Sequence, residues 1–235
     1  MEYLQGARAL RNDPHGAQVL FAGSVLLASS LFVPLLGHIA LAGWQSLVLR
    51  RLVRGETGLP PLSLDLESLG KLVAIGFKGF IARLVWFAPP MILLSVLTSC
   101  SIVGLSLAVG DSAPGQLAAL LAVYGTVLPL FFLVQIPGHF AALRADLAGD
   151  LNEGLKRREV VAMTLDMGRT AVLTGAVLAL LQIGLALGGL LLCCVGIFPA
   201  AVIGWTAHTF VFAELYRRWL SQGGVPIHSL AETNL

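Results

Sequence analysis

The sequence predicts an all-α fold class, a polytopic transmembrane helical bundle of about five spans with additional interfacial helices. Of the 235 residues, 57% are hydrophobic and 12% are charged, and the mean hydropathy is +0.85. Because a typical soluble domain contains about 25% charged residues, lipid is the expected solvent for most of this chain. The small formal net charge of +2 indicates no nucleic-acid partner.

The first apolar segment begins at Ala17 and continues without a charged residue to Leu49. About 20 apolar residues cross a bilayer as a helix, so this segment is longer than one untilted span. Pro34 and Gly37 interrupt it. It is therefore either one kinked helix that continues into the interface or a re-entrant hairpin, and the side of the membrane on which the N-terminus lies depends on this choice. We favour the single kinked span.

The second apolar segment follows three arginines and the turn sequence Gly-Leu-Pro-Pro at residues 58–61. Residues 65–83 mix five charged side chains with Leu, Ile and Phe, a pattern typical of a helix that lies on the membrane surface. We expect this helix to lead into a span from about Leu84 to Val109, with Pro89 and Pro90 near its start.

Three further spans are expected in the rest of the chain. The third span runs from about Gln116 to Phe140, is interrupted by Pro129 and Pro137, and passes into a polar stretch and another interfacial segment. The fourth and fifth spans cover residues 170–192 and 198–216. The chain is then one integral membrane domain (1–235), with an N-terminal tail (1–16), a first half (17–109), a second half (115–192), a last span (198–219) and a polar tail (220–235).

The positions of the basic residues predict the orientation in the membrane. Thirteen of the fifteen Lys and Arg residues follow the first, third and fifth spans, while the short loops near Asp111 and Cys193 contain none. Basic loops are retained on the cytoplasmic side of a membrane. We therefore expect a multi-pass protein of the cell membrane whose basic loops and C-terminus are cytoplasmic.

A short motif and the elements around it recur about a hundred residues apart. Residues 37–40 read Gly-His-Ile-Ala and residues 138–141 read Gly-His-Phe-Ala, each at the end of an apolar segment that contains proline. Each copy is followed by a basic stretch, an interfacial segment and a long apolar span. This order predicts a tandem repeat of two parallel halves, with the last span as an appendage.

Three histidines and two glutamines are the candidate interior polar residues. A twofold relation between the halves would bring His38 and His139 to one axis, where two imidazoles can bind a metal, a haem or a proton. We favour a structural role for both, since no Asp, Glu or Cys stands at ligand spacing beside them. His208 is expected to hydrogen-bond a neighbouring helix. Gln135 and Gln182 could line a polar path or join helices.

Small residues in the fourth span predict close helix packing. Gly184 and Gly188 form a GxxxG motif, and Gly175 and Ala179 precede them at another four-residue step. Small side chains let helices approach closely in lipid. The contact could lie within the bundle or between copies, and the sequence leaves both open.

The three cysteines do not predict a cofactor or metal site. Cys100, Cys193 and Cys194 are too few for a disulfide framework and lack the spacing of a zinc site. We interpret them as packing residues. Pairing of Cys100 with the adjacent cysteines in an oxidising compartment is the alternative that we favour less.

Several short motifs are spread over most of the chain. They are Asp13-Pro14, Gly43-Trp44 with Arg50, Arg51 and Arg54, Gly55-Glu56, Leu59-Pro60, Gly70-Lys71-Leu72 and Arg158-Glu159-Val160. These motifs resemble those of one family of bacterial and archaeal multi-pass membrane proteins, the domain-of-unknown-function family 4013. The resemblance covers about residues 13–218 and implies the multi-pass topology, but it implies no activity. Where family members tend to have an aromatic and acidic run, this chain has Pro61–Asp65, which puts any family role of that loop in doubt.

Two classes of function stay open, and neither is an enzyme. The chain contains no phosphate-binding loop, nucleophile elbow, HExxH motif or catalytic carboxylate pair. The central spans also lack the charged residues that an ion-coupled pump needs.

We favour a non-catalytic scaffold or accessory subunit whose partners are the lipid bilayer and either further copies or other membrane subunits. The alternative is a transporter or channel for a neutral or lipid-like substrate at the interface of the halves. A cavity lined by His38, His139 and Gln135 would favour transport, whereas packing of these residues against backbone carbonyls would favour the scaffold. A metal- or haem-bearing redox subunit is a third, less favoured class.

Overall fold

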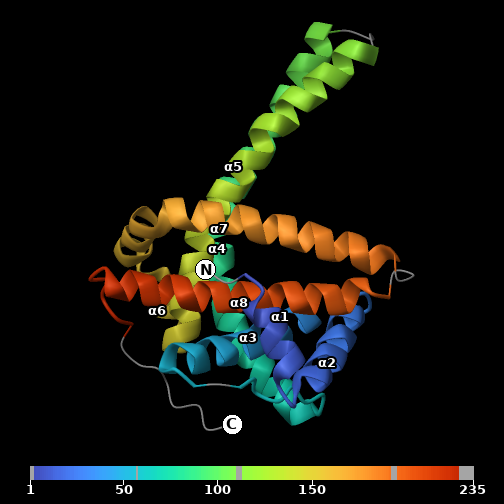
Figure 1. Cartoon of the computed structure of the whole chain (residues 1–235). Coiled ribbons are helices and arrows are strands. Elements are labelled where there is room, and N and C mark those ends of the chain that lie inside the picture. The colour runs from blue at the N-terminus through green and yellow to red at the C-terminus, as the bar shows by residue number, and fades with distance from the viewer. Residues whose placement is uncertain (1–2, 57, 110–112, 192–194, 228–235) are drawn as a thin grey trace.

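In the computed structural model, residues 3–56, 58–109, 113–191 and 195–227 are described, and they form helices and no strands. The predicted all-α fold class is therefore confirmed. Figure 1 shows the arrangement of the helices in this part of the chain. They are α1 (Gln5–Asn12), α2 (Gly16–Ser29), α3 (Leu36–Arg54), α4 (Leu66–Val109), α5 (Ala113–Ala148), α6 (Leu151–Leu155), α7 (Arg157–Leu191) and α8 (Ile197–Ser221).

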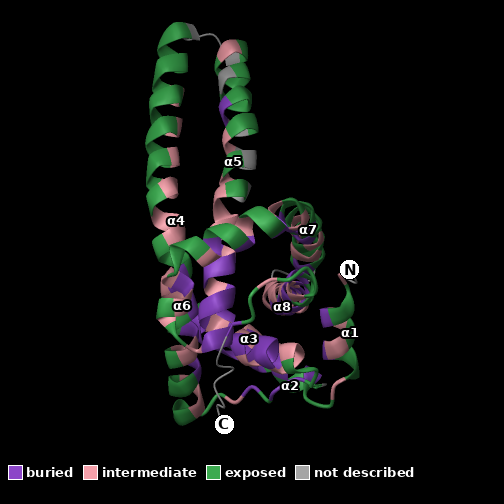
Figure 2. Cartoon of the chain, turned by 90° about the vertical axis from the view of Figure 1, so that its left-hand side faces the viewer, coloured by how far each residue is buried: buried purple, intermediate pink, exposed green. Residues whose placement is uncertain are grey.

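The helices α4 and α5 form a long hairpin whose distal half protrudes from a body made by the other helices (Figures 1 and 2). Within the body, α7 and α8 lie side by side and run across the long axis of the hairpin, as both views show. The buried residues gather in the body, whereas the protruding part of the hairpin is mainly exposed (Figure 2). The predicted spans are therefore not all parallel to one another in this structure.

Three helices are long and apolar enough to cross a membrane, and their ranges are Leu66–Ala108, Arg157–Leu191 and Ile197–Ser221. The helix α5 adds a shorter apolar stretch, Pro114–Val127. This composition indicates a membrane protein, as predicted. The count of five spans and the two-half repeat stay predictions. The loop near Asp111 and the pair at residues 193–194 lie outside the described residues.

Two predicted interfacial segments are continuous with the spans that follow them. The helix α4 runs without interruption from Leu66 through the expected start of the span at Leu84, and α7 likewise joins residues 157–169 to the apolar residues after them. Pro89 and Pro90 lie inside α4. A proline in a helix removes one backbone donor and need not end the helix where neighbouring backbone bonds are kept.

The first apolar segment folds as a helical hairpin, so the single kinked helix that we favoured is not formed. The helices α2 and α3 are separated at Leu35, a non-glycine residue with a φ of 72°. Gly37 then allows α3 to pass close to α2, because a Cβ at this position would lie 1.8 Å from the backbone oxygen of Leu26. The chain reversal thus depends on one left-handed residue and one glycine.

Two hydrophobic clusters hold the body together. One cluster lies among α5, α7 and α8 and includes Phe140, Met163 and Leu215. The other lies among α2, α3 and α8 and includes Leu41 and Trp44. Because α8 contributes to both clusters, it joins the helices of the first half to those of the second.

The helices α3 and α4 cross at a pair of glycines. A Cβ at Gly43 would lie 1.9 Å from the backbone oxygen of Leu72, and a Cβ at Gly76 would lie 2.0 Å from that of Ile39. The two backbones are therefore in direct contact, and any larger side chain here would separate them. This close crossing brings the end of α3, which bears Arg50, next to α4 and α5.

Candidate functional site

A polar cluster lies where α3, α4 and α5 meet, and Asp146 is at its centre. Asp146 lies in the last turn of α5, beyond the apolar part of this helix. Burial raises the pKa of the Asp146 carboxyl to about 7, against the opposing effects of a hydrogen bond from Ser46 and the positive charges of Arg50 and Arg83. Its Oδ1 is buried and accepts no hydrogen bond in the described structure. The cluster therefore holds a carboxyl group that titrates near neutral pH.

Basic side chains from two helices meet the C-terminal end of α5. Arg50 Nε on α3 donates a hydrogen bond to the backbone oxygen of Asp146 at 2.6 Å. Lys78 Nζ on α4 donates to the backbone oxygen of Gly149 at 2.8 Å. The last carbonyl groups of a helix lack intrahelical partners and carry a partial negative charge, so cations stabilise this end.

Gly79 on α4 makes room for the buried carboxylate. A Cβ at this position would lie 2.2 Å from Asp146 Oδ1. Nearby, Trp86 Nε1 on the same helix donates to the backbone oxygen of Gly154 in α6 at 3.0 Å. The sequence of α4 is thus adapted to α5 and α6 along two turns of helix.

Arg83, His139 and Gln135 form a hydrogen-bonded group one or two turns further along α4 and α5. His139 Nδ1 lies 2.8 Å from the backbone oxygen of Gln135, and its Nε2 lies 2.9 Å from Arg83 Nη2. A carbonyl oxygen can only accept and a guanidinium can only donate, so Nδ1 donates and Nε2 accepts. His139 is therefore the neutral Nδ1–H tautomer. Gln135 Oε1 also accepts from Arg83 at 3.4 Å.

The helix α8 contacts both histidines of the repeated motif, at different residues. The His139 ring lies 5.2 Å from that of His208, and His208 lies 4.4 Å from Phe212. His38 lies 5.5 Å from Trp205 instead, with its Nδ1 3.0 Å from the Ser30 hydroxyl. His38 and His139 are thus not brought together, whereas His139 and His208 are.

Arg144 is a buried ionic residue that the sequence analysis did not single out. Its side chain is only 3% exposed and its Nη2 lies 2.9 Å from Glu153 Oε2, with a second contact to Glu159. It therefore joins α5, α6 and the start of α7. One signal could have identified it, because Arg144 follows Phe140 by four residues and so lies on the buried face of α5 if the helix continues.

The small residues of α7 lie on two different sides of that helix. Gly175 and Gly184 are nine residues apart, about two and a half helical turns, so Gly175 and Ala179 lie roughly opposite Gly184 and Gly188. A Cβ at Gly175, Gly184 or Gly188 would meet no other atom within 4 Å. The predicted packing residues thus belong to two surfaces, and at these glycines both are open. Gln182 packs against Gly204 of α8.

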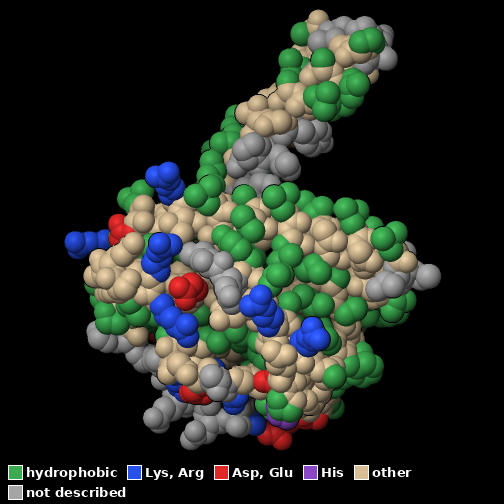
Figure 3. All heavy atoms as spheres, viewed as in Figure 1, with side chains coloured by type: hydrophobic (Ala, Val, Ile, Leu, Met, Phe, Trp, Pro, Cys, Tyr) green, Lys and Arg blue, Asp and Glu red, His purple; other side chains and the backbone are tan. Residues whose placement is uncertain are grey.

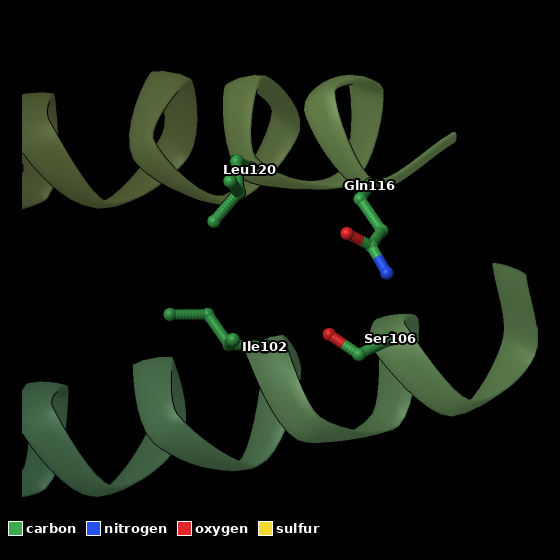
Figure 4. Close-up of a pocket in the computed structure, with 4 residues that line it drawn as sticks. All are labelled: Ile102, Ser106, Gln116 and Leu120. Carbon is green, nitrogen blue, oxygen red and sulfur yellow. The ribbon is translucent and has the colours of Figure 1, made fainter. Parts of the chain in front are cut away.

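The predicted polar candidates line neither of two clefts among the described residues. A cleft of about 150 Å³ lies between the helices of the hairpin near its tip, lined by Ile102, Ser106, Gln116 and Leu120 (Figure 4). A cleft of about 430 Å³ lies between the start of the chain, α7 and α8. In the described part of the chain, no group of three or more His, Cys, Asp or Glu residues could hold a metal ion.

These features define an all-helical membrane protein with an internal polar cluster that joins its helices. The family described as "Protein of unknown function (DUF4013)" matches residues 26–207, so the chain belongs to this family. The family suggested by the short motifs of the sequence is thereby confirmed. No curated protein and no solved structure matches the chain.

Proposed function

We propose that this protein is a non-catalytic integral membrane protein that acts as a scaffold or accessory subunit, either as a homo-oligomer or within a larger membrane complex. The observation that carries the proposal is the use of its internal polar side chains. His139 is held by Arg83 and a backbone carbonyl, and Arg50 binds the backbone of α5. Side chains held in this way are not free to bind a substrate. Of the three residues whose packing against carbonyls would favour a scaffold, His139 makes such a contact.

Uncovered apolar surfaces support the need for partners. The protruding hairpin carries exposed side chains on both helices, and hydrophobic groups cover much of it in Figure 3. Contact with lipid explains the exposed apolar side chains of the hairpin. The surface of α7 around Gly184 and Gly188 is also uncovered, and Ile183 and Leu187 beside it are exposed. A small-residue face flanked by large apolar side chains favours a second helix, because backbones can approach closely there.

The proposed topology keeps the spans at residues 84–109, 116–140, 170–192 and 198–216 and makes the α2–α3 hairpin a re-entrant segment. The N-terminus, the basic regions and the C-terminus then all lie on the cytoplasmic side. Residues 84–109 of α4 are about 39 Å long as a helix, enough to cross about 30 Å of hydrocarbon. The apolar part of α7 is exposed on most of its circumference, which supports a place in lipid rather than at a surface. This topology requires the α7–α8 pair to turn parallel to the hairpin in the bilayer, with the two repeat halves side by side.

Transport of a neutral or lipid-like substrate is the alternative proposal. The prolines within α4 and the Pro137 position in α5 support it, because broken helices line the sites of many transporters. Neither described cleft contains His38, His139 or Gln135, so the geometry favours the scaffold.

Oligomer formation through α7 can be tested by light scattering of the purified protein in detergent. We expect a defined oligomer for the natural chain and a smaller assembly for Gly184→Leu with Gly188→Leu. Gly168→Leu is the matched control, since this glycine is also in open space but lies about four and a half turns before Gly184, on the other side of α7. An unchanged mass in the double variant would contradict assembly through this face.

A further inference from the structure

The larger cleft brings together two arginines from neighbouring helices. It has a volume of about 430 Å³. Arg169 comes from α7 and Arg218 from the end of α8. Hydroxyl groups and one leucine complete the lining. The residues are Tyr3, Arg169, Thr170, Leu173, Thr174 and Arg218.

Neither arginine has a carboxylate partner in the described part of the chain. The nearest acidic residues along their own helices are Asp166, one turn before Arg169, and Glu214, one turn before Arg218. Glu214 pairs at 3.9 Å with Arg217, the other arginine at this end of α8. Two guanidinium groups therefore line a cleft without a carboxylate beside them in the described part of the chain, in contrast to Arg144 between its two glutamates.

The cleft lies where α7 changes from polar to apolar. Residues 157–169 include five charged side chains, one of which is Arg169, whereas residues 170–191 include none. The surface of a bilayer is expected at such a boundary. Leu173, one turn into the apolar part, is exposed beside the arginines. In Figure 3 the Lys and Arg side chains of this face lie over the left and central part of the body.

We propose that this cleft binds the phosphate group of an anionic phospholipid. Guanidinium groups bind phosphate oxygens with paired, charge-assisted hydrogen bonds, and hydroxyl groups such as that of Thr170 add further donors. Leu173 contacts the glycerol and the first part of the acyl chains. The volume is within the range of sites for small ligands. Basic pockets between helices on the cytoplasmic side of membranes suit anionic headgroups.

The inference depends on a membrane location and not on the scaffold role. It assigns the cleft to lipid rather than to free phosphate because of the apolar lining and the position at the polar–apolar boundary. A free phosphate ion would gain nothing from Leu173.

The test uses the full chain in nanodiscs of phosphatidylcholine with a minor fraction of phosphatidylglycerol. The measured quantity is the phosphatidylglycerol retained by the protein after gentle detergent extraction, relative to its share of the disc. We expect enrichment for the natural chain and a loss of about fivefold for each arginine removed in Arg169→Gln and Arg218→Gln. The control is the double variant Arg157→Gln with Arg158→Gln. It removes two positive charges from α7 outside the cleft, as many as the two cleft substitutions remove together. Equal losses in the control and in the cleft variants would overturn the proposal.

Two further measurements distinguish a lipid headgroup from free phosphate. Both use the unaltered chain, so their outcome does not depend on the folding of a variant. Inorganic phosphate is titrated into discs of pure phosphatidylcholine. Phosphate binding by a chain that shows no enrichment of phosphatidylglycerol would overturn the lipid assignment. A photoactivatable phosphatidylglycerol is then crosslinked to the unaltered chain. We expect labelled peptides from residues 3–10 and 169–175, and labelling confined to other segments would also overturn the proposal.

Discussion

Arg50 Nε donates a hydrogen bond to the backbone oxygen of Asp146, 2.6 Å away across 96 residues of sequence. This contact joins α3 of the predicted first half to α5 of the second. It also ends α5 in a cationic environment, which stabilises its C-terminal carbonyl groups. The internal polar cluster therefore connects α3 to α5, two helices that are far apart in the sequence.

Gly79→Ala should destabilise the protein through this junction. The added Cβ would lie 2.2 Å from Asp146 Oδ1, so the carboxylate or the helix must move. We expect the free energy of unfolding in detergent to fall by about 1–3 kcal/mol. Gly70→Ala is the control, because the same helix has open space there and alanine favours helix by up to about 1 kcal/mol. Equal effects of the two substitutions would show that Gly79 does not hold the space for Asp146.

The stability should decrease as the pH rises towards neutrality. The pKa of Asp146 is about 7 in the folded protein, against 3.8 for an ordinary Asp, so the folded state binds the proton more tightly. The stabilisation from proton binding to Asp146 is complete below about pH 4 and is lost as the pH rises to about 7. At about 1.4 kcal/mol for each pH unit between the two pKa values, the free energy of unfolding falls by about 4 kcal/mol. The surrounding groups are Ser46, Arg50 and Arg83.

This pH dependence is measured as the difference in unfolding free energy between the natural chain and Asp146→Asn, from pH 4 to pH 8.5. The asparagine cannot ionise, so other titrating groups cancel in the difference. We expect the variant to gain stability relative to the natural chain as the pH rises. A constant difference over this range would mean that Asp146 has an ordinary pKa.

Arg144→Ala should cost more than the loss of a surface ion pair. Arg144 is 3% exposed, while its partners Glu153 and Glu159 are 19% and 43% exposed. Removing Arg144 leaves the Glu153 carboxylate without its cationic partner inside the body. We expect the free energy of unfolding to fall by about 1–3 kcal/mol. Lys156→Ala removes the exposed partner of Glu153 and should cost less than about 1 kcal/mol. Thermal unfolding followed by circular dichroism compares the two, and the reverse order would contradict the role given to Arg144.

Cysteine labelling tests the proposed topology. In a variant without Cys100, Cys193 and Cys194, single cysteines are placed at Val177 in α7 and Leu107 near the tip of the hairpin. A membrane-impermeant maleimide should label Leu107→Cys from the outer side and leave Val177→Cys unlabelled from both sides. Labelling of Val177→Cys in intact membranes would instead place α7 outside the hydrocarbon core.

The apolar periodicity and the breaks in it predicted α8 almost residue by residue, since a last span at residues 198–219 corresponds to a helix at Ile197–Ser221. The membrane class and the family were equally accessible from sequence. The hairpin at Leu35 was only the less favoured of two readings, because a left-handed non-glycine residue has no sequence signal and depends on packing of α2 against α3. The burial of Arg144 and Asp146 had no sequence signal of its own, because charged residues are seldom buried, and only the contacts with neighbouring helices show how they are compensated.

The sequence also predicted the arrangement of the candidate site only in part. The sequence named His139, Gln135 and His208 as candidate interior polar residues, and the structure places them near one another. It could not exclude His38 from this group, since the twofold relation that suggested the pairing is a property of three-dimensional arrangement. The partner of His38 is Trp205, one turn of α8 away from His208.

Native mass spectrometry of the protein, extracted with minimal detergent, tests the scaffold proposal most directly, because it reports copy number, bound subunits and bound lipid together. We predict a defined homo-oligomer or a stoichiometric membrane partner. A bare monomer that retains one small molecule or one neutral lipid would contradict the scaffold and favour transport at the interface of the two halves.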